Sequence, residues 1–323
     1  MSGPWPAPVQ VVEPIKLGYW PFVRQLLRFA KGADAIVLRG TSGFSEGYVE
    51  AVAALMIKLR YRDPPLVLVS DASWDLTSQG LERRLPVALR PLLPKLGRWA
   101  VHLADGRHVV YCVLSTDEQR LFNQRWGIDG ARVRFTPYFA SLPTQLVASA
   151  SDDGYIFAGG NTNRDYGLLV EAAEDLDFPV RIASSWKPSR RLPDNVTVNW
   201  LPHDDYNRAM AGASLVVVPL YETARSVGQQ TYLSAMLLGK PVIVTDAPGV
   251  RDYLQPGETA HVVDRDPVAL RAAIDWVLDP GNRASVQAMT ERARKAVDEK
   301  YLRSHYFSRL WQAAAEEVVS RSH

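Results

Sequence analysis

The sequence predicts an α/β protein made of two halves, each built on a parallel sheet. Short runs rich in Val, Ile and Leu alternate with segments of helical spacing, which is the pattern of β-α-β units. The alternation occurs twice, and a small, polar stretch at 140–152 separates the two series. Several of the runs are apolar throughout, as is typical of strands covered on both faces. We therefore expect two sheet-and-helix halves that face a cleft.

The expected elements follow from apolar runs, turn residues and helical spacing. In the first half, the expected strands are 35–39, 66–70, 109–114 and 133–137. The expected helices there are 17–34, 46–60, a Pro-interrupted 81–103 and one that Ser115 caps together with Glu118. In the second half, the expected strands are 155–158, 180–183, 196–200, 215–219 and 242–245. The expected helices there begin at Arg164, Asp204 and Gly228, and a helical tail covers 267–321.

The composition excludes several classes of protein. The chain has 323 residues, 47% of them hydrophobic, and a net charge of +2, so we expect a globular chain without a nucleic-acid partner. Cys112 stands alone in an apolar run, which predicts a buried structural thiol and a reducing compartment. The first residues lack the basic region and apolar core of a signal peptide, so the expected location is the cytoplasm. The six histidines show no metal-ligand spacing, and we expect no metal and no cofactor.

The strongest functional signal lies in the stretch 226–254. A helix that starts at Gly228 is followed by the buried strand and then by a Pro-Gly turn. This order puts the start of a helix beside the carboxyl end of a strand. In an open parallel sheet, anionic ligands bind at such a junction because free backbone N–H groups and the helix dipole both point outward.

This stretch resembles a known signature. SAMLLGKPVIVTDAPGVRDYL, residues 234–254, is similar to the "EAMA-GKPV" helix, strand and "G-G-x-x-[DE]" turn of the retaining, family 4 type of GT-B glycosyltransferases, the glycosyl transferases group 1. Residues 155–169 resemble the opening strand and phosphate-binding loop of that family, and PYFASLP resembles its hinge. The match is good over roughly 105–300 and weak before it.

The resemblance implies two facing Rossmann-like domains with a C-terminal helix that crosses back to the first. The expected domains are 1–140 on the acceptor side, 150–300 for the nucleotide sugar, and 301–323 as the crossing helix. The implied reaction is metal-independent transfer of a hexosyl group from a nucleotide diphosphate sugar to a hydroxyl of a sugar or lipid-linked acceptor, with retention. Such a reaction belongs to polysaccharide or glycan biosynthesis.

The second half supplies the expected donor site. Arg164 and Arg225 are expected to neutralise the diphosphate and to assist catalysis. The expected donor-binding residues are Gly159, Gly160, Asn161, Ser184, Leu201, Glu222, Ser226, Gly228, Gln229, Gln230 and Thr231. Ordinary alternatives exist: a Gly-Gly turn with an exposed Arg164, a helix merely capped by Ser226, and a solvated loop acid at Glu222. Trp200 has a core position as its simplest interpretation.

The sequence departs from the family pattern at two places. The paired glutamates of the family, spaced E-x7-E, align with Ser226 and Ser234, and an Arg of the first loop aligns with Asn161. A Lys of that loop is matched by Arg164. These departures leave two alternatives open: a non-catalytic nucleotide-sugar-binding partner subunit, and a GT-B sugar-nucleotide epimerase.

The first half supplies the expected acceptor side. Gly40, Thr41, Ser42 and Gly43 follow one strand and are expected to line the cleft. Asp71 follows the next strand, where it would orient or deprotonate the acceptor hydroxyl, or else cap the turn that follows. Basic residues surround apolar ones at 16–31 and 81–99, including Arg83, Arg84 and Arg90. Such segments either bind an anionic membrane surface, here the inner membrane face, or form ordinary half-buried helices with a solvated basic face.

Overall fold

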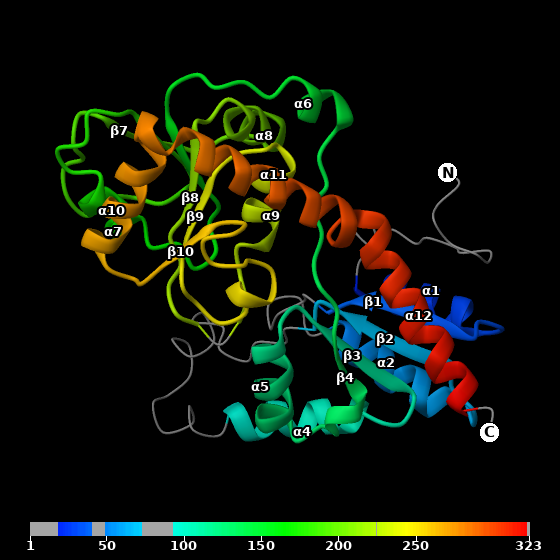
Figure 1. The fold of residues 1–323 in the computed structure, drawn as a ribbon. Helices are drawn as coiled ribbons and strands as arrows, with labels where there is room; N and C mark the ends of the chain where they lie inside the picture. Colours follow the sequence, from blue (N-terminus) through cyan, green and yellow to red (C-terminus); the bar gives the residue numbers. More distant parts are fainter. Residues whose placement is uncertain (1–18, 41–48, 73–92, 224, 322–323) are drawn as a thin grey trace. The chain divides into compact units, whose positions relative to one another are not determined.

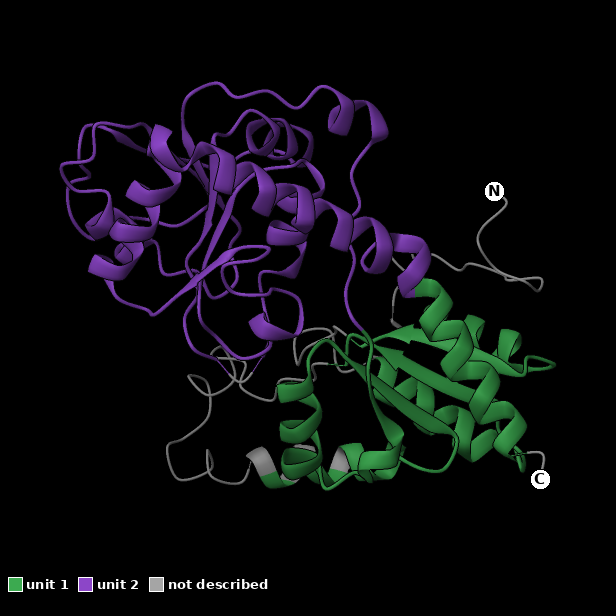
Figure 2. Cartoon of the chain, viewed as in Figure 1, with its two compact units in different colours: residues 1–136, 307–323 green, residues 137–306 purple. Residues whose placement is uncertain are grey.

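The computed structural model describes residues 19–40, 49–72, 93–223 and 225–321 (Figure 1). The chain divides into two compact units, residues 1–136 with 307–323, and residues 137–306 (Figure 2). Each unit contains one parallel sheet covered by helices, which confirms the expected α/β class. The N-terminal arm and most of the Pro-interrupted stretch 81–103 lie outside the described residues.

The first unit has a four-stranded parallel sheet in the order β1-β2-β3-β4. Its strands are β1 (Ala35–Arg39), β2 (Leu66–Ser70), β3 (Val109–Val113) and β4 (Val133–Phe135). Every residue of β2 and β3 is buried, as their unbroken apolar runs predict for central strands. The last strand ends at Phe135, two residues earlier than expected, although the N–H of Thr136 still donates to Val113 O of β3 at 2.8 Å.

The helices of the first unit are α1 (Tyr19–Ala30), α2 (Val49–Arg60), α4 (Leu93–Ala104) and α5 (Thr116–Trp126), with the short η4 (Gly130–Arg132) before β4. α1, α2, α4 and α5 pack in succession, each against the next. α5 begins where the sequence predicts, because Ser115 accepts a hydrogen bond from the N–H of Glu118 at 3.0 Å.

The second unit has a six-stranded parallel sheet in the order β10-β9-β8-β5-β6-β7. Its strands are β5 (Ile156–Gly159), β6 (Val180–Ala183), β7 (Val196–Asn199), β8 (Leu215–Val218), β9 (Val242–Thr245) and β10 (His261–Val263). The edge strand β10 has no counterpart among the expected strands, because its three residues are only half-buried and form too short a run to detect.

The helices of the second unit are α6 (Thr144–Ala148), α7 (Tyr166–Ala172), α8 (His203–Ala211), α9 (Gln229–Leu237), α10 (Pro267–Leu278) and α11 (Arg283–Lys300), with η5 (Val250–Asp252) and η6 (Pro280–Asn282). α9 begins after Gly228, as expected. α7 begins two residues later than expected, because Asp165 is its N-cap and accepts from the N–H of Leu168 at 3.1 Å.

The chain passes between the units at two places, residues 136–137 and 306–307. The C-terminal helix α12 (Arg303–Arg321) starts in the second unit and belongs to the first from Phe307 onward, which confirms the expected crossing. Arg134 of β4 holds it there, with ion pairs to Glu316 at 2.6 Å and Glu317 at 2.5 Å. The stretch 140–152 contains α6 and lies within the second unit.

Candidate functional site

The second sheet reverses its order between β5 and β8. From β5 the chain continues to β6 and β7 on one side, whereas β8 leads to β9 and β10 on the other. The two loops that leave the carboxyl ends of β5 and β8 are joined by hydrogen bonds from Asp165 N to Pro219 O at 2.9 Å and from Tyr221 N to Asn163 O at 3.2 Å. Ligands of open α/β sheets bind at such a switch point.

α9 opens at this edge without a capping side chain. Its N-cap is Gly228, whose φ of 94° lies in the left-handed region, and no side chain accepts from the first turn. The first turn also contains no acidic residue. Ser226 is buried, and its hydroxyl accepts from the side-chain amide of Gln229. Ser226 is therefore not the cap of this helix, and the backbone N–H groups of Gln229 and Gln230, in the first turn, have no acceptor within the helix.

Arg164 lies beside the start of α9. Its Nε donates to Gly159 O at 3.1 Å, Nη1 to Thr162 O at 2.7 Å and Nη2 to Thr231 Oγ1 at 3.3 Å. The alternative of a freely exposed side chain is thereby wrong, since the guanidinium is mostly buried.

In the described part of the chain, no carboxylate lies beside the charge of Arg164. None of the ion pairs within the described residues includes Arg164. Burial lowers the pKa of Arg164 from its ordinary value, an effect that the nearby phenols of Tyr166, Tyr206 and Tyr232 oppose. A mostly buried cation beside an open helix start is an arrangement that an anion would complete.

Gly159 and Gly160 are each required to be glycine, but for different structural reasons. A methyl group on Gly159 would collide with Tyr206, whose hydroxyl oxygen would lie 2.6 Å from it. Gly160 has a φ of 108°, and its carbonyl accepts from the Tyr166 hydroxyl at 2.5 Å. Tyr206 is a neighbour that the sequence does not reveal, because it comes from α8, far from the loop along the chain.

Asn161 joins the loops after β5 and β6. Its Oδ1 accepts from Ser184 Oγ at 2.7 Å, from Ser185 N at 2.9 Å and from Ser185 Oγ at 3.0 Å. Ser184 Oγ in turn accepts from the N–H of Trp186 at 3.1 Å. The structure thus brings Asn161 and Ser184 together, as their expected common role requires.

The remaining residues of the expected donor site line the same edge of the sheet. Leu201 follows β7 and is half-buried, and its neighbour Trp200 is 64% exposed, so the expectation that Trp200 belongs to the core is wrong. Glu222 is exposed after β8. Arg225 lies half-buried on the loop before α9, and its carbonyl accepts from Thr223 Oγ1 at 2.8 Å.

On the first unit, Gly40 and Asp71 end neighbouring strands. A side chain on Gly40 would collide with Val69, so β1 and β2 approach closely there, and Gly40 N donates to Ser70 O at 2.6 Å. Asp71 is buried and has a φ of 53°, a strained value for a non-glycine residue that is common near functional sites. Thr41, Ser42 and Gly43 lie outside the described residues.

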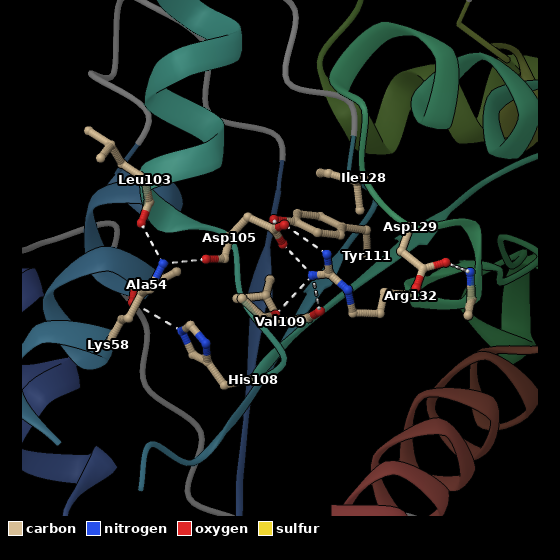
Figure 3. Close-up of polar contacts among 12 residues, drawn as sticks. Ala54, Lys58, Leu103, Asp105, His108, Val109, Tyr111, Ile128, Asp129 and Arg132 are labelled. Atoms are coloured by element: carbon tan, nitrogen blue, oxygen red, sulfur yellow. Dashed lines mark hydrogen bonds and ion pairs between the residues drawn. The ribbon is translucent and has the colours of Figure 1, made fainter. Parts of the chain in front are cut away.

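The amino ends of the strands of the first sheet carry a polar cluster that Figure 3 shows. Arg132 donates to Asp105 Oδ2 at 2.7 Å, and Tyr111 donates to Asp105 Oδ1 at 3.1 Å. Lys58 of α2 donates to the carbonyls of Leu103, at 3.1 Å, and Asp105, at 2.5 Å, which closes the end of α4. This cluster stands at the amino ends of β3 and β4 and ties the helices to the sheet.

Two buried groups of the first unit are structural. Burial raises the pKa of the Cys112 thiol to about 11, so it is protonated and inert, which confirms the expected structural thiol. Burial also lowers the pKa of His108, whose Nε2 lies 3.4 Å from Ala54 O.

The described part of the chain contains neither a metal-ligand cluster nor a membrane-spanning helix. No three His, Cys, Asp or Glu side chains of those residues gather in a way that would hold a metal ion. No helix among them combines the length and apolarity needed to cross a bilayer.

A protein-family model matches part of the second unit. Residues 166–280 match the family model of the glycosyl transferases group 1. They include α9 and the loop before it, whereas Gly159 to Arg164 immediately precede them. No curated protein matches the chain.

Solved structures with the same fold cover nearly the whole chain. Sucrose-phosphate synthase from Thermosynechococcus elongatus aligns with a TM-score of 0.64 at 17% identity, over 97% of this chain and 82% of that one. HepE from Anabaena, in complex with UDP and glucose, aligns with a TM-score of 0.65 at 14% identity, over 95% of this chain and 84% of that one. WaaG, a glycosyltransferase involved in lipopolysaccharide biosynthesis, aligns with a TM-score of 0.57 at 15% identity, over 90% and 94%. The fold of this chain is therefore that of the GT-B glycosyltransferases.

Proposed function

We propose that this chain is a glycosyltransferase that moves a hexosyl group from a nucleotide diphosphate sugar to an acceptor hydroxyl, with retention and without a metal ion. One observation carries the proposal: the mostly buried Arg164 has no carboxylate partner among the described residues and stands beside the uncapped start of α9. The match to the group 1 family model supports the reaction class, and HepE, a structural neighbour, was solved with UDP-glucose.

The diphosphate is the group that the site is suited to bind. The N–H groups of Gln229 and Gln230 and the guanidinium of Arg164 would hold its oxygens, with Arg225 as a further cation. As the bond from the anomeric carbon to the β-phosphate oxygen breaks, negative charge grows on that phosphate. Fixed donors that await this charge lower the barrier without reorganising, and they would replace a metal ion.

The remaining roles are assigned by chemistry. The acceptor oxygen bonds to the anomeric carbon on the face that the phosphate leaves, and its proton passes to a β-phosphate oxygen, so no separate base is required. Asp71 would orient that acceptor hydroxyl. Glu222 and Ser226 would contact the sugar, and the loops held by Asn161 and Ser184, together with Leu201, would contact the nucleoside.

The test separates binding from turnover. Calorimetry with UDP, GDP and ADP should find one nucleotide diphosphate that binds in the micromolar range without added metal. Incubation of its hexose conjugates with hydroxyl acceptors should then release the nucleotide and form a product of retained anomeric configuration. A chain that binds none of the three nucleotides would disprove the donor site, and an inverted product would disprove retention.

A non-catalytic nucleotide-sugar binder remains the second candidate, because Ser226 and Ser234 stand where the family has paired glutamates. Both are buried, and Ser226 is occupied by the side chain of Gln229. Binding without turnover across acceptors would favour this candidate. A sugar-nucleotide epimerase would instead convert the donor in the absence of any acceptor, which mass and stereochemical analysis of the product would reveal.

We also propose that the first unit associates with an anionic membrane, at the cytoplasmic face, through α4. All the ionisable residues of this helix are basic or histidine, and Lys95, Arg98 and His102 are exposed beside Trp99, which is 64% exposed. Arg83, Arg84 and Arg90 lie outside the described residues. Vesicles of phosphatidylglycerol should pellet the protein and those of phosphatidylcholine should not. Trp99→Ala should lower the pelleted fraction, whereas Val268→Ala, at an exposed site on α10, should not; equal pelleting of all three proteins would refute the proposal.

A further inference from the structure

Tyr206 is a half-buried tyrosine of α8 that reaches the start of α9. Its ring fills the space that a side chain on Gly159 would need, and it packs edge-to-face on Phe157 with 5.2 Å between ring centroids. Its hydroxyl lies 3.2 Å from Thr231 Oγ1. Thr231 is the third residue of α9 and is itself buried, so the two hydroxyls meet in the first turn of the helix.

The hydroxyl of Thr231 has two neighbours, and they fix the direction of its hydrogen bonds. Arg164 Nη2 lies 3.3 Å from the same oxygen, and a guanidinium can only donate. If Thr231 donated to Tyr206, the phenol proton would be left without an acceptor, because Thr231 is the only hydrogen-bond partner of that hydroxyl among the described residues. Burial of an unsatisfied donor is costly, so Tyr206 donates and Thr231 accepts from both sides.

We infer that Tyr206 is a positioning residue that holds the hydroxyl of Thr231 as a donor to the bound diphosphate. With both lone pairs of its oxygen engaged, Thr231 keeps its own proton for a third partner. That proton belongs to the first turn of α9, where the N–H groups of Gln229 and Gln230 also donate. The inference rests on the proposed function, since it names a further group that contacts the phosphates.

The same geometry explains why Gly159 is glycine. Its missing side chain admits the Tyr206 ring, which lets a residue of α8 touch a residue of α9 across the end of β5. The structure therefore assigns Gly159 a role in recognition that is indirect: it makes room for the tyrosine that orders Thr231.

Binding of the nucleotide diphosphate tests the inference, with the cognate one of UDP, GDP and ADP chosen on the wild-type protein. Thr231→Val should weaken its affinity about tenfold, the size of one hydrogen bond to a charged group, and Thr231→Ser should keep affinity within about twofold. Tyr206→Phe should weaken affinity about threefold. The matching nucleoside, which has no phosphates, should bind all four proteins equally.

A double variant separates positioning from general damage. If Tyr206 acts through Thr231, Tyr206→Phe should cause no further loss of affinity in the Thr231→Val background. It should also restore thermal stability there, because it removes the phenol that Thr231→Val leaves unsatisfied. Tyr155→Phe is the matched control: its hydroxyl donates to Ala209 O of the same α8 at 2.7 Å, at the other edge of the sheet, and its loss should leave affinity unchanged.

The outcomes are distinct. A wild-type protein that binds none of the three nucleotides removes the proposed function and this inference with it. A wild-type protein that binds one of them, with Thr231→Val and Tyr206→Phe equal to it in affinity, overturns the inference alone. Additive losses in the double variant likewise overturn it, because Tyr206 would then act independently of Thr231.

Discussion

Two helices of this chain begin at the carboxyl end of a buried parallel strand, and their starts are built in opposite ways. α5 follows β3 of the first unit, and its first turn is closed by its own side chains: Ser115 accepts from Glu118 N, and Glu118 Oε2 accepts from Leu114 N at 2.8 Å. α9 follows β8 of the second unit and has a glycine N-cap, no capping hydrogen bond and no acidic residue in its first turn.

The difference shows what an anion site requires beyond a helix dipole. Asp117 and Glu118 place negative charge at the start of α5. These charges stabilise the helix through its dipole and repel a further anion. At α9 the neighbouring charge is the positive Arg164 instead. The same secondary-structure junction is therefore a self-satisfied scaffold element in one unit and a candidate binding element in the other.

The largest effect should follow the loss of the cation beside α9. Arg164→Met keeps much of the apolar stem of the side chain but removes its charge-assisted contacts, so the affinity for the nucleotide diphosphate should fall about 100-fold. Calorimetry measures this, with circular dichroism as the control for folding. An affinity within threefold of the wild type would mean that α9 binds the anion without Arg164, and that the contrast with α5 is overstated.

The next effect comes from giving α9 the charge that α5 carries. Gln230 is the second residue of α9, the place that Asp117 holds in α5. Gln230→Glu should stabilise the helix by about 0.3–1 kcal/mol through the dipole. It should also weaken the binding of the nucleotide diphosphate about tenfold, because the new charge repels the phosphates. A rise in melting temperature together with a fall in affinity would indicate an effect of charge. Gln230→Met is the uncharged control, and weakened binding in both variants would point to a lost contact instead of charge.

The reverse experiment opens α5. Glu118→Gln replaces one acceptor oxygen by a donor and removes one of the two negative charges of the first turn, so the free energy of unfolding should fall by about 1 kcal/mol. Because Glu118 belongs to a helix that caps itself, nucleotide affinity should stay the same. Denaturant unfolding and calorimetry on the same sample would check both, and a gain of phosphate binding at α5 would show that a helix start with reduced negative charge suffices without a neighbouring cation.

The sequence predicts much of this contrast, but not all of it. Both helix starts can be predicted from the sequence, because their signals are local: Ser115 with Glu118 for α5, and Gly228 for α9. The sequence does not predict that Ser226 turns away to Gln229 or that Tyr206 meets Thr231, because these contacts join segments that only the folded sheet brings together. Likewise, the prolines near α4 prevented the sequence from predicting where that helix begins. β10 is too short for its residues to show a strand pattern.

A smaller effect concerns one histidine in each unit. Burial lowers the pKa of both His108 and His261 from the usual value of 6.5. Each is therefore protonated more readily in the unfolded chain, so its contribution to stability is complete above about pH 6.5 and is lost as the pH falls through the folded pKa. His261→Phe keeps an aromatic ring against Trp276 and should flatten the decline of melting temperature below pH 6.5. A decline as steep as that of the wild type would exclude His261 as a cause.

The smallest effect is expected at Tyr232, which belongs to the same first turns of α9 as Thr231. Its side chain is fully buried, and its hydroxyl has no hydrogen-bond partner among the described residues. Tyr232→Phe removes an unsatisfied polar group and keeps the ring against Tyr253, so stability should stay equal or rise by up to about 1 kcal/mol.

Tyr253 is the matched control for that change, because its hydroxyl accepts from the N–H of Tyr138 at 2.9 Å. Tyr253→Phe should therefore cost about 1 kcal/mol in denaturant unfolding, where Tyr232→Phe costs nothing. If Tyr232→Phe destabilised the protein as much as Tyr253→Phe, the phenol of Tyr232 would have a partner in solution. It would then join Tyr206 as a second tyrosine that orders the start of α9.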